Sequence, residues 1–305
     1  MMLGEDGEAD DSRSFGSKSV SWRILVISAG AIMNFALALL ISTIMALFTA
    51  SSDTTIRAFS STVTPSPIEA AGVQIGDRIV RINNQNVNIY GDFFLEMQRA
   101  DGSPINIEVE RDGARHNFTV MPHLHNDGYI LGFHPGSMVG PFFAQTQVAA
   151  DGTVINVDAQ TWVHRMGFFE SIGAGLRSMV FNIRLIIFSL GQLFTGNLSV
   201  DGMMGPVGIV GAVGEQIGGS AAAGGGLAAL WAALSFAALI SANLGVFNLL
   251  PIPALDGGRL VFLFLEAIRR KPISPDKEGM VHFAGFVLLI GLLVFITYND
   301  IVRLL

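Results

Sequence analysis

The sequence predicts a polytopic α-helical membrane protein with an inserted α+β domain, and three observations lead to this fold class. Only 14% of the 305 residues are charged, against about 25% in ordinary soluble domains, and the mean hydropathy is +0.52. The run from Gln216 to Leu255 holds 40 residues without a charged side chain, more than the roughly 20 that cross a bilayer. Between residues 53 and 122, charges return and β-branched residues alternate with polar ones, which indicates strands of a folded domain.

Charge and composition exclude several functions. The formal net charge is −7 and no basic stripe is present, so we do not expect the chain to bind nucleic acid. Cysteine is absent, which excludes disulfides, thiolate metal sites and cysteine nucleophiles. The long apolar runs make the lipid bilayer the first expected partner.

The first transmembrane helix is predicted at residues 24–50. This segment holds 27 residues without a charge, and Lys18 and Arg23 precede it. Because positive flanks stay on the cytoplasmic side, residues 1–23 are expected to form a cytoplasmic loop. Asn34 lies inside the helix, where a polar side chain either bonds a neighbouring helix or belongs to a site.

Residues 53–122 are predicted to form an extracytoplasmic domain. Ile105–Glu110 and His116–Val120 alternate as two strands around a tight turn, and Pro67–Gly72 has the pattern of a short helix. The segment Ala71-Gly-Val-Gln-Ile-Gly-Asp-Arg-Ile79 resembles part of a PDZ domain. PDZ domains bind extended peptides or chain ends by strand addition, so the resemblance implies a peptide ligand. A folded spacer or steric gate without a ligand is the alternative.

Residues 123–165 are predicted to extend this domain with loops and short strands. Asp151-Gly152, followed by an alternating segment, indicates a hairpin. His123 and His125 flank a single leucine, but no carboxylate or third histidine is close by in the sequence. We therefore assign these two histidines to a solvated loop and not to a metal site.

Residues 166–200 predict an amphipathic helix on the outer membrane surface. Glu170, Arg177 and Arg184 recur every seven residues, so they form one charged stripe on an otherwise apolar helix. The chain would then re-enter the membrane through residues 222–268, of which residues 222–255 carry no charge. Just before and at the start of this segment, we expect Gly218–Gly226 to form flexible backbone of small residues.

A basic cluster at residues 269–278 sets the orientation of the last two helices, because such clusters stay in the cytoplasm. We predict a cytoplasmic loop there and a last transmembrane helix at residues 279–299. His282 lies near the cytoplasmic end of that helix. We interpret it as a hydrogen-bonded structural residue, with metal ligation as the alternative.

The most informative stretch interrupts the apolar run and reads Asn248-Leu-Leu-Pro-Ile-Pro-Ala-Leu-Asp-Gly-Gly258. Its prolines remove backbone donors, so it predicts broken helix, which membranes tolerate only where protein or a polar cavity surrounds it. An ionisable residue at such a place is a candidate functional residue. Asp256 could relay protons, bind a cation as in a transporter, or ligate a catalytic metal. The residue pattern is compatible with all three.

A complete hydrolytic zinc site does not arise from these residues, because zinc needs two or three further ligands, usually histidine. No pair among the six histidines has the spacing His-Glu-x-x-His. Five of the six lie in the part predicted to be outside the membrane, namely His116, His123, His125, His134 and His164.

The long stretch from Asn243 to Gly258 is similar to the second active-site motif of site-2 proteases, the intramembrane zinc metalloproteases, and specifically of the bacterial RseP type. Other segments resemble those of the family and keep the family order. They are Met2–Asp6, Gly30–Asn34, the PDZ-like segment, Gly205–Ile209 and Asn299–Arg303. Residue 31 is alanine, where the family usually has proline.

This resemblance implies a helical membrane core with an extracytoplasmic PDZ domain, in a bacterial inner or plasma membrane. It implies zinc as the cofactor and an extended substrate segment, because a helix hides its carbonyl groups. The implied site residues are Asp256 as a metal ligand, Asn248, Pro251 and Pro253 for substrate binding, and Asn34, Asn243 and Gly257 as supporting residues.

The implied function is regulated intramembrane proteolysis of single-span substrates, such as anti-sigma-factor-like regulators or signal-peptide remnants. In this family two histidine ligands and the general base lie in a His-Glu-x-x-His motif on the first span, and the 305 residues contain no such motif. We therefore expect the chain by itself to be inactive, as a truncated protease with no catalytic residue of its own.

Four alternatives remain: a pseudoprotease, a split enzyme, a non-catalytic membrane-anchored PDZ peptide-binding protein, and a transporter that uses Asp256 as its coupling site. An in-frame His-Glu-x-x-His helix in the DNA upstream of Met1 would favour the protease. A stop codon there would favour the binding protein.

Overall fold

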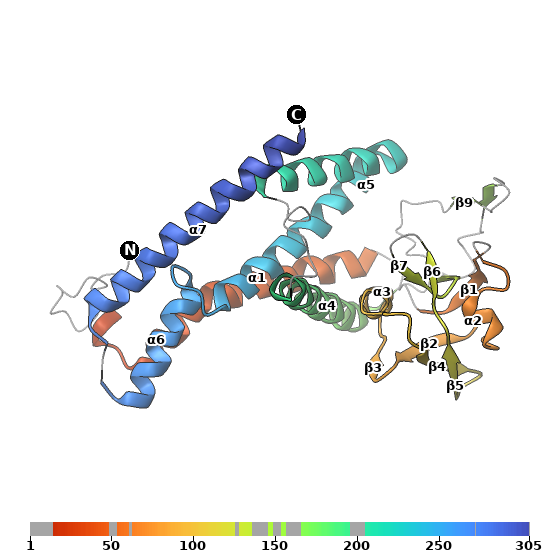
Figure 1. The fold of residues 1–305 in the computed structure, drawn as a ribbon, viewed down its shortest axis with the longest axis horizontal. Helices are drawn as coiled ribbons and strands as arrows, with labels where there is room; N and C mark the ends of the chain where they lie inside the picture. The colour runs from red at the N-terminus through yellow and green to blue at the C-terminus, as the bar shows by residue number, and fades with distance from the viewer. Residues whose placement is uncertain are drawn as a thin grey trace. The chain divides into compact units, whose positions relative to one another are not determined.

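The structure is a computed structural model that describes residues 15–48, 54–60, 63–125, 128–135, 146–148, 154–156, 166–195, 205–271 and 273–304. The chain divides into two compact units. The helical unit comprises Met1–Ile41 and Asn182–Leu305, and the sheet unit comprises Ser42–Phe181. Figure 1 shows the elements of both units.

Long helices make up most of the described chain. Four of them are long and apolar enough to cross a membrane by length and composition, and few of their residues are buried inside the protein. This agrees with the predicted multi-pass membrane protein. The helices are α1 (Val20–Phe48), α4 (Phe168–Phe194), α5 (Pro206–Leu249), α6 (Asp256–Arg269) and α7 (Pro275–Leu304), with α6 not among the four.

α4 covers most of the segment predicted to lie on the membrane surface. Its length and apolar composition also suffice for a span. The surface placement therefore stays a prediction, and residues 196–200 at its predicted end lie outside the described residues.

α5 differs from the sequence-based expectation of flexible backbone at Gly218–Gly226. The helix continues through this segment, and only Gly225 departs from helical geometry, with φ at 73°. The bend is visible where α5 changes direction in Figure 1. Alanine, the best helix former, occupies three consecutive positions here, which explains why the helix persists.

The sheet unit contains a small antiparallel sheet of order β3-β2-β4-β5. β2 (Arg78–Ile82) pairs with both β3 (Gln85–Asn86) and β4 (Ile105–Arg111), and β4 continues into β5 (Ala114–Val120). The two-residue turn between β4 and β5 has positive φ at Asp112 and Gly113, so the predicted strand pair is confirmed.

Three further strand pairs accompany this sheet. They are β1 (Ile56–Phe59) with β8 (Phe133–Pro135), β6 (His123–His125) with β7 (Gly128–Ile130), and β9 (Thr146–Val148) with β10 (Val154–Asn156). The last pair agrees with the predicted hairpin, whose turn at Asp151-Gly152 lies outside the described residues.

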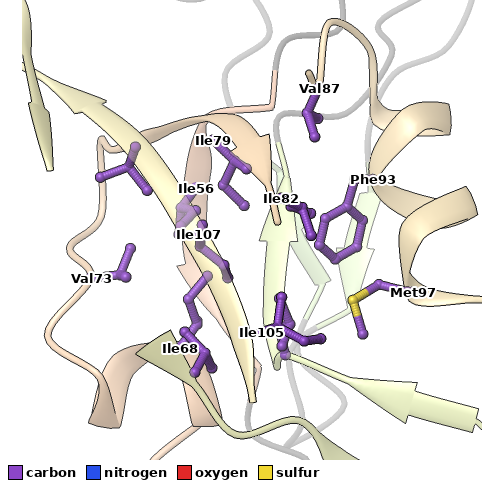
Figure 2. Close-up of a cluster of buried hydrophobic side chains, with 13 residues drawn as sticks. Ile56, Ile68, Val73, Ile79, Ile82, Val87, Phe93, Met97, Ile105 and Ile107 are labelled. Carbon is purple, nitrogen blue, oxygen red and sulfur yellow. The ribbon is translucent and has the colours of Figure 1, made fainter. Parts of the chain in front are cut away.

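Two short helices cover the core of the sheet unit. α2 (Pro67–Ala70) confirms the predicted short helix and starts at a capping box between Ser66 and Glu69. α3 (Tyr90–Met97) was not predicted from the sequence, and it places Phe93 and Met97 against the sheet. Figure 2 shows the resulting core, to which the buried positions of β2 and β4 contribute isoleucine and valine. The PDZ-like identity of this unit stays a prediction.

Candidate functional site

The turn between α5 and α6 forms the candidate site. α5 ends at Leu249, and Pro251 and Pro253 follow without backbone N–H groups to continue the helix. The turn closes through short-range bonds, with the Ile252 N–H donating to the Leu250 carbonyl at 2.7 Å. A new helix then starts at Asp256.

Two buried glycines allow the turn to fold back on the first turn of α6. A Cβ on Gly257 would overlap the carbonyl group of Leu250, and one on Gly258 would lie 2.6 Å from the carbonyl oxygen of Ile252. Any larger residue at either position would push the turn away from the helix. The two glycines after the carboxylate therefore allow the close packing of the turn next to Asp256.

Asp256 itself is partly buried and faces α1. A Cβ added to Gly30 would lie 3.6 Å from its Oδ2 atom, so the carboxylate lies in van der Waals range of the Gly30–Asn34 segment. Within the described residues, no hydrogen bond or ion pair engages this carboxylate. Its position at the N-terminus of α6 favours negative charge there.

α1 and α5 are held together beside this site. The Ser241 hydroxyl donates to the Asn34 carbonyl oxygen at 2.8 Å. A Cβ on Gly245 would lie 2.7 Å from the ring of Phe35, so the two helices approach closely. Asn34 thus contributes its backbone carbonyl to helix packing, whereas the role of its side chain stays a prediction.

The remaining predicted site residues flank the turn. Asn243 and Asn248 are half-buried on α5, and Pro251 is exposed. Pro253 packs against α7, where a Cβ on Gly285 would lie 2.7 Å from its carbonyl oxygen.

His282 on α7 contacts the same turn. Its Nδ1 atom accepts a hydrogen bond from the Ala254 N–H at 2.9 Å. A neutral imidazole that accepts at Nδ1 carries its proton on Nε2, and a protonated nitrogen cannot bind a metal. In this arrangement His282 is a hydrogen-bonded structural residue, as predicted, and is not a zinc ligand.

These residues fit one ligand of a zinc site and not a complete site. The described parts of the chain contain no group of three histidine, aspartate or glutamate side chains that could hold a metal ion. Asp256 has the chemistry of a zinc ligand, but two or three partners would be required.

Two other polar contacts in the helical unit escaped the sequence analysis. The Asp300 carboxylate accepts from the Gly205 N–H at 3.1 Å and from the Gly208 N–H at 2.8 Å, which caps the start of α5. Arg23 on α1 forms a largely buried ion pair with Glu266 on α6. Both join segments far apart in the chain. The Asp300 contact joins the segments Gly205–Ile209 and Asn299–Arg303. Their order along the chain was the only signal in the sequence that could have suggested it.

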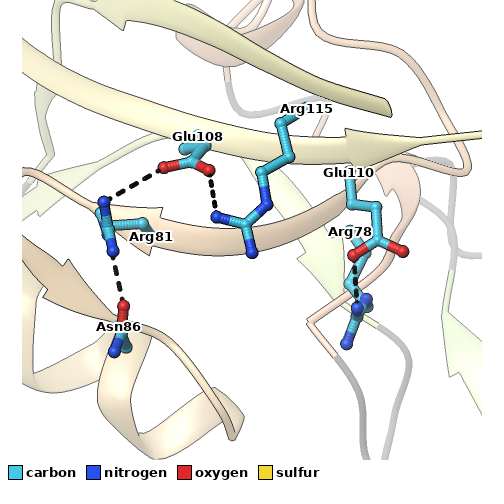
Figure 3. Close-up of polar contacts among 6 residues, drawn as sticks. All are labelled: Arg78, Arg81, Asn86, Glu108, Glu110 and Arg115. Atoms are coloured by element: carbon cyan, nitrogen blue, oxygen red, sulfur yellow. Dashed lines mark hydrogen bonds and ion pairs between the residues drawn. The ribbon is translucent and has the colours of Figure 1, made fainter. Parts of the chain in front are cut away.

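The sheet unit has a hollow of its own, of about 550 Å³, on the outer side of β2 and β4. Figure 3 shows the ion pairs along it: Arg78 with Glu110, and Glu108 shared between Arg81 and Arg115. Because one carboxylate serves two guanidinium groups, positive charge is left over, and an anionic ligand would be favoured.

The chain has long apolar helices and, where prolines interrupt the helix, a carboxylate without a described hydrogen bond or ion pair. These features are typical of membrane proteins with a polar site between apolar helices. Residues 4–292 match peptidase family M50. The chain belongs to this family, the site-2 zinc metalloproteases.

Individual relatives agree with this assignment. The zinc metalloprotease RasP of Shouchella clausii is 34% identical over 297 residues, which cover 96% of this chain and 62% of that protein. The regulator of sigma-W protease RasP of Bacillus subtilis is 34% identical, over 98% of this chain and 64% of its own length. A putative zinc metalloprotease of Clostridium acetobutylicum is 33% identical, over 99% and 78%. The chain thus spans less than two thirds of the RasP proteins.

Proposed function

We propose that this chain is part of an intramembrane zinc endopeptidase that cleaves single-span membrane substrates, with Asp256 as one of the zinc ligands. Family membership and the names of the relatives support the zinc peptidase class. The observation that carries the residue assignment is the carboxylate of Asp256, which faces α1 beside Gly30 and makes no described hydrogen bond or ion pair.

The other ligands and the general base lie in a separate segment in this proposal, because the 305 residues contain no His-Glu-x-x-His motif. The chain alone is then inactive. Gly30 on α1 marks the face where those ligands would have to approach, since the Asp256 Oδ2 atom points there.

Asn248, Pro251 and Pro253 surround the substrate in this proposal. Asn248 on the last turn of α5 offers amide groups that could bond an extended peptide, and the two prolines keep the following backbone out of a helix. Asn34, Asn243 and Gly257 support the packing around them. The substrates would be membrane-anchored regulators or signal-peptide remnants. The name of the Bacillus subtilis relative, regulator of sigma-W protease, is in line with the first of these.

The sheet unit acts in this proposal as an extracytoplasmic PDZ-like domain, and α4 lies on the outer membrane surface. The cationic hollow on β2 and β4 favours a second candidate function, the binding of an acidic peptide by a non-catalytic membrane anchor. This candidate predicts peptide binding that Asp256→Ala leaves unchanged.

The test uses the full 305-residue chain, produced together with a membrane segment that carries the His-Glu-x-x-His motif of a relative. We expect about one zinc ion per assembly, measured by mass spectrometry of the metal, and cleavage of a single-span reporter. Asp256→Ala should lose both, whereas the matched control Asp276→Ala, an exposed aspartate on α7, should keep both. Unchanged zinc content and cleavage in Asp256→Ala would refute the ligand assignment.

A further inference from the structure

The turn before Asp256 contains a backbone conformation that needs support. Ala254 has a φ of 78°, a region that residues with a Cβ rarely adopt. It lies two residues before the carboxylate, so its conformation sets where α6 begins and where Asp256 points. A residue in this region persists only where its surroundings hold it.

One face of α7 provides that support. His282 and Gly285 are three residues apart on the helix and therefore lie on the same side. The first accepts the Ala254 N–H at 2.9 Å, and the second leaves room for Pro253, whose carbonyl oxygen would be 2.7 Å from a Cβ at this position. α7 therefore contacts the turn at two consecutive residues, Pro253 and Ala254.

The imidazole is itself held in place. The ring of Phe262 on α6 lies 5.7 Å away, centroid to centroid. The Nε2 atom is buried without a hydrogen-bond partner among the described residues, and the nearest carboxylate oxygen, on Glu278, is 3.9 Å away. Since this distance exceeds a hydrogen bond, the bond from the Ala254 N–H is the only hydrogen bond of the imidazole within the described residues.

We propose that His282 is a positioning residue, which holds the Ala254 turn through its Nδ1 atom and thereby orients the carboxylate of Asp256. Its catalytic consequence rests on the proposed zinc ligation by Asp256. The position requires a compact neutral acceptor, which explains histidine at a place where lysine or arginine could only donate.

Two substitutions separate this role from mere packing. In His282→Asn the side-chain oxygen can replace Nδ1 as the acceptor, while His282→Leu fills similar space without an acceptor. Asp276→Asn, on the exposed first turn of the same helix, is the control.

The first readout is amide hydrogen exchange of the full chain in detergent micelles, resolved at Ala254. Pro251 and Pro253 have no amide hydrogen, so few other amides contribute to the signal of this turn. We expect His282→Leu to speed exchange at Ala254 by roughly tenfold or more, as for an amide that loses its only partner. His282→Asn and the control should remain near the unsubstituted chain.

The second readout is zinc content and cleavage in the assembly described above. We expect His282→Leu to lose cleavage and His282→Asn to recover most of it. Unchanged exchange in His282→Leu, or an Asn variant as fast as the Leu variant, would overturn the proposal. Exchange needs no metal. A failure of zinc ligation by Asp256 would therefore appear in the Asp256→Ala assay, while the exchange result would still stand.

Discussion

Asp77 in the sheet unit and Asp300 in the helical unit are both almost fully buried, with 1% and 3% of their surfaces exposed, yet they are stabilised in different ways. Asp77 is bound by the Arg111 guanidinium through two bonds of 2.7 Å. Asp300 instead accepts two backbone N–H groups, from Gly205 and Gly208 at the start of α5.

The difference follows from the surroundings of each carboxylate. The Arg111 side chain is 24% exposed, so its charge stays partly in water while its guanidinium group binds the buried Asp77 carboxylate. At Asp300, the N–H groups at the start of α5, which have no partner within their own helix, donate the two described hydrogen bonds.

Asp256 fits neither pattern. Within the described residues, no arginine and no backbone N–H donates a hydrogen bond to it, although it lies at the first residue of α6. Asp77 and Asp300 have hydrogen-bond donors, whereas Asp256 has none among the described residues. A partly buried carboxylate of this kind is a candidate metal ligand.

The largest effect on stability is expected from Asp77→Asn. The substitution removes the charge that compensates Arg111 and one acceptor of the bidentate pair, so it should destabilise the sheet unit by about 2 kcal/mol, less than for a fully enclosed pair because Arg111 reaches water. Hydrogen exchange at β2 and β4 in the full chain measures this. The control is Asp112→Asn, an exposed turn residue with a φ of 51° that asparagine tolerates.

The same pair predicts a pH dependence. Burial alone would raise the pKa of Asp77, but the hydrogen bonds from Arg111 and the Gln74 N–H, with the Arg111 charge, outweigh it and lower the pKa. The resulting stability is present above the unfolded pKa of about 3.9 and is lost as pH falls through the lower folded value. The difference in stability between the unsubstituted chain and Asp77→Asn should therefore shrink below about pH 4. An equal difference in stability at pH 7 and pH 3 would contradict this.

A smaller loss is expected from Asp300→Ala. Removing the cap leaves two N–H groups at the start of α5 without their partner, which should cost about 1 to 2 kcal/mol. Thermal unfolding in detergent should show a lower midpoint than for the exposed control Asp276→Ala. Faster exchange confined to Gly205 and Gly208 would sharpen the comparison, and no difference between the two variants would break it.

The smallest effect is expected from Arg115→Gln on the outer side of the sheet. The Arg115 side chain is 64% exposed and shares Glu108 with Arg81, so its loss should cost less than about 1 kcal/mol and less still at high salt. The same exchange measurement, made at low and high salt, would check this. A loss as large as that of Asp77→Asn would show that exposed and buried pairs are equivalent here.

Local patterns predicted much of this architecture. The apolar runs predicted helices that occupy the expected segments, and the alternation on either side of Asp112-Gly113 predicted β4 and β5. Gly218–Gly226 was misread because glycine content suggested flexible backbone, whereas continuous backbone hydrogen bonding keeps the segment helical except at Gly225. α3 was missed because its short apolar pattern gives little periodic signal.

The candidate site was predictable only as a motif. The prolines, glycines and lone carboxylate of Asn248–Gly258 indicated a broken helix with a functional residue, and the turn has that form. Which residues hold the turn was not predictable, because His282 meets Ala254 across 28 positions of the chain.

The sequence by itself determined most of the long helices, the strand pair and the position of the unusual carboxylate, because local hydrophobic periodicity, prolines and glycines act within a few residues. Only the tertiary structure decided that Asp300 caps a helix 92 and 95 positions away, that Asp77 pairs with an arginine, and that Asp256 has no such partner among the residues that the structure describes. The partner of a buried polar group is set by which segments pack together, and the cost of leaving such a group unpaired acts only after packing has excluded water.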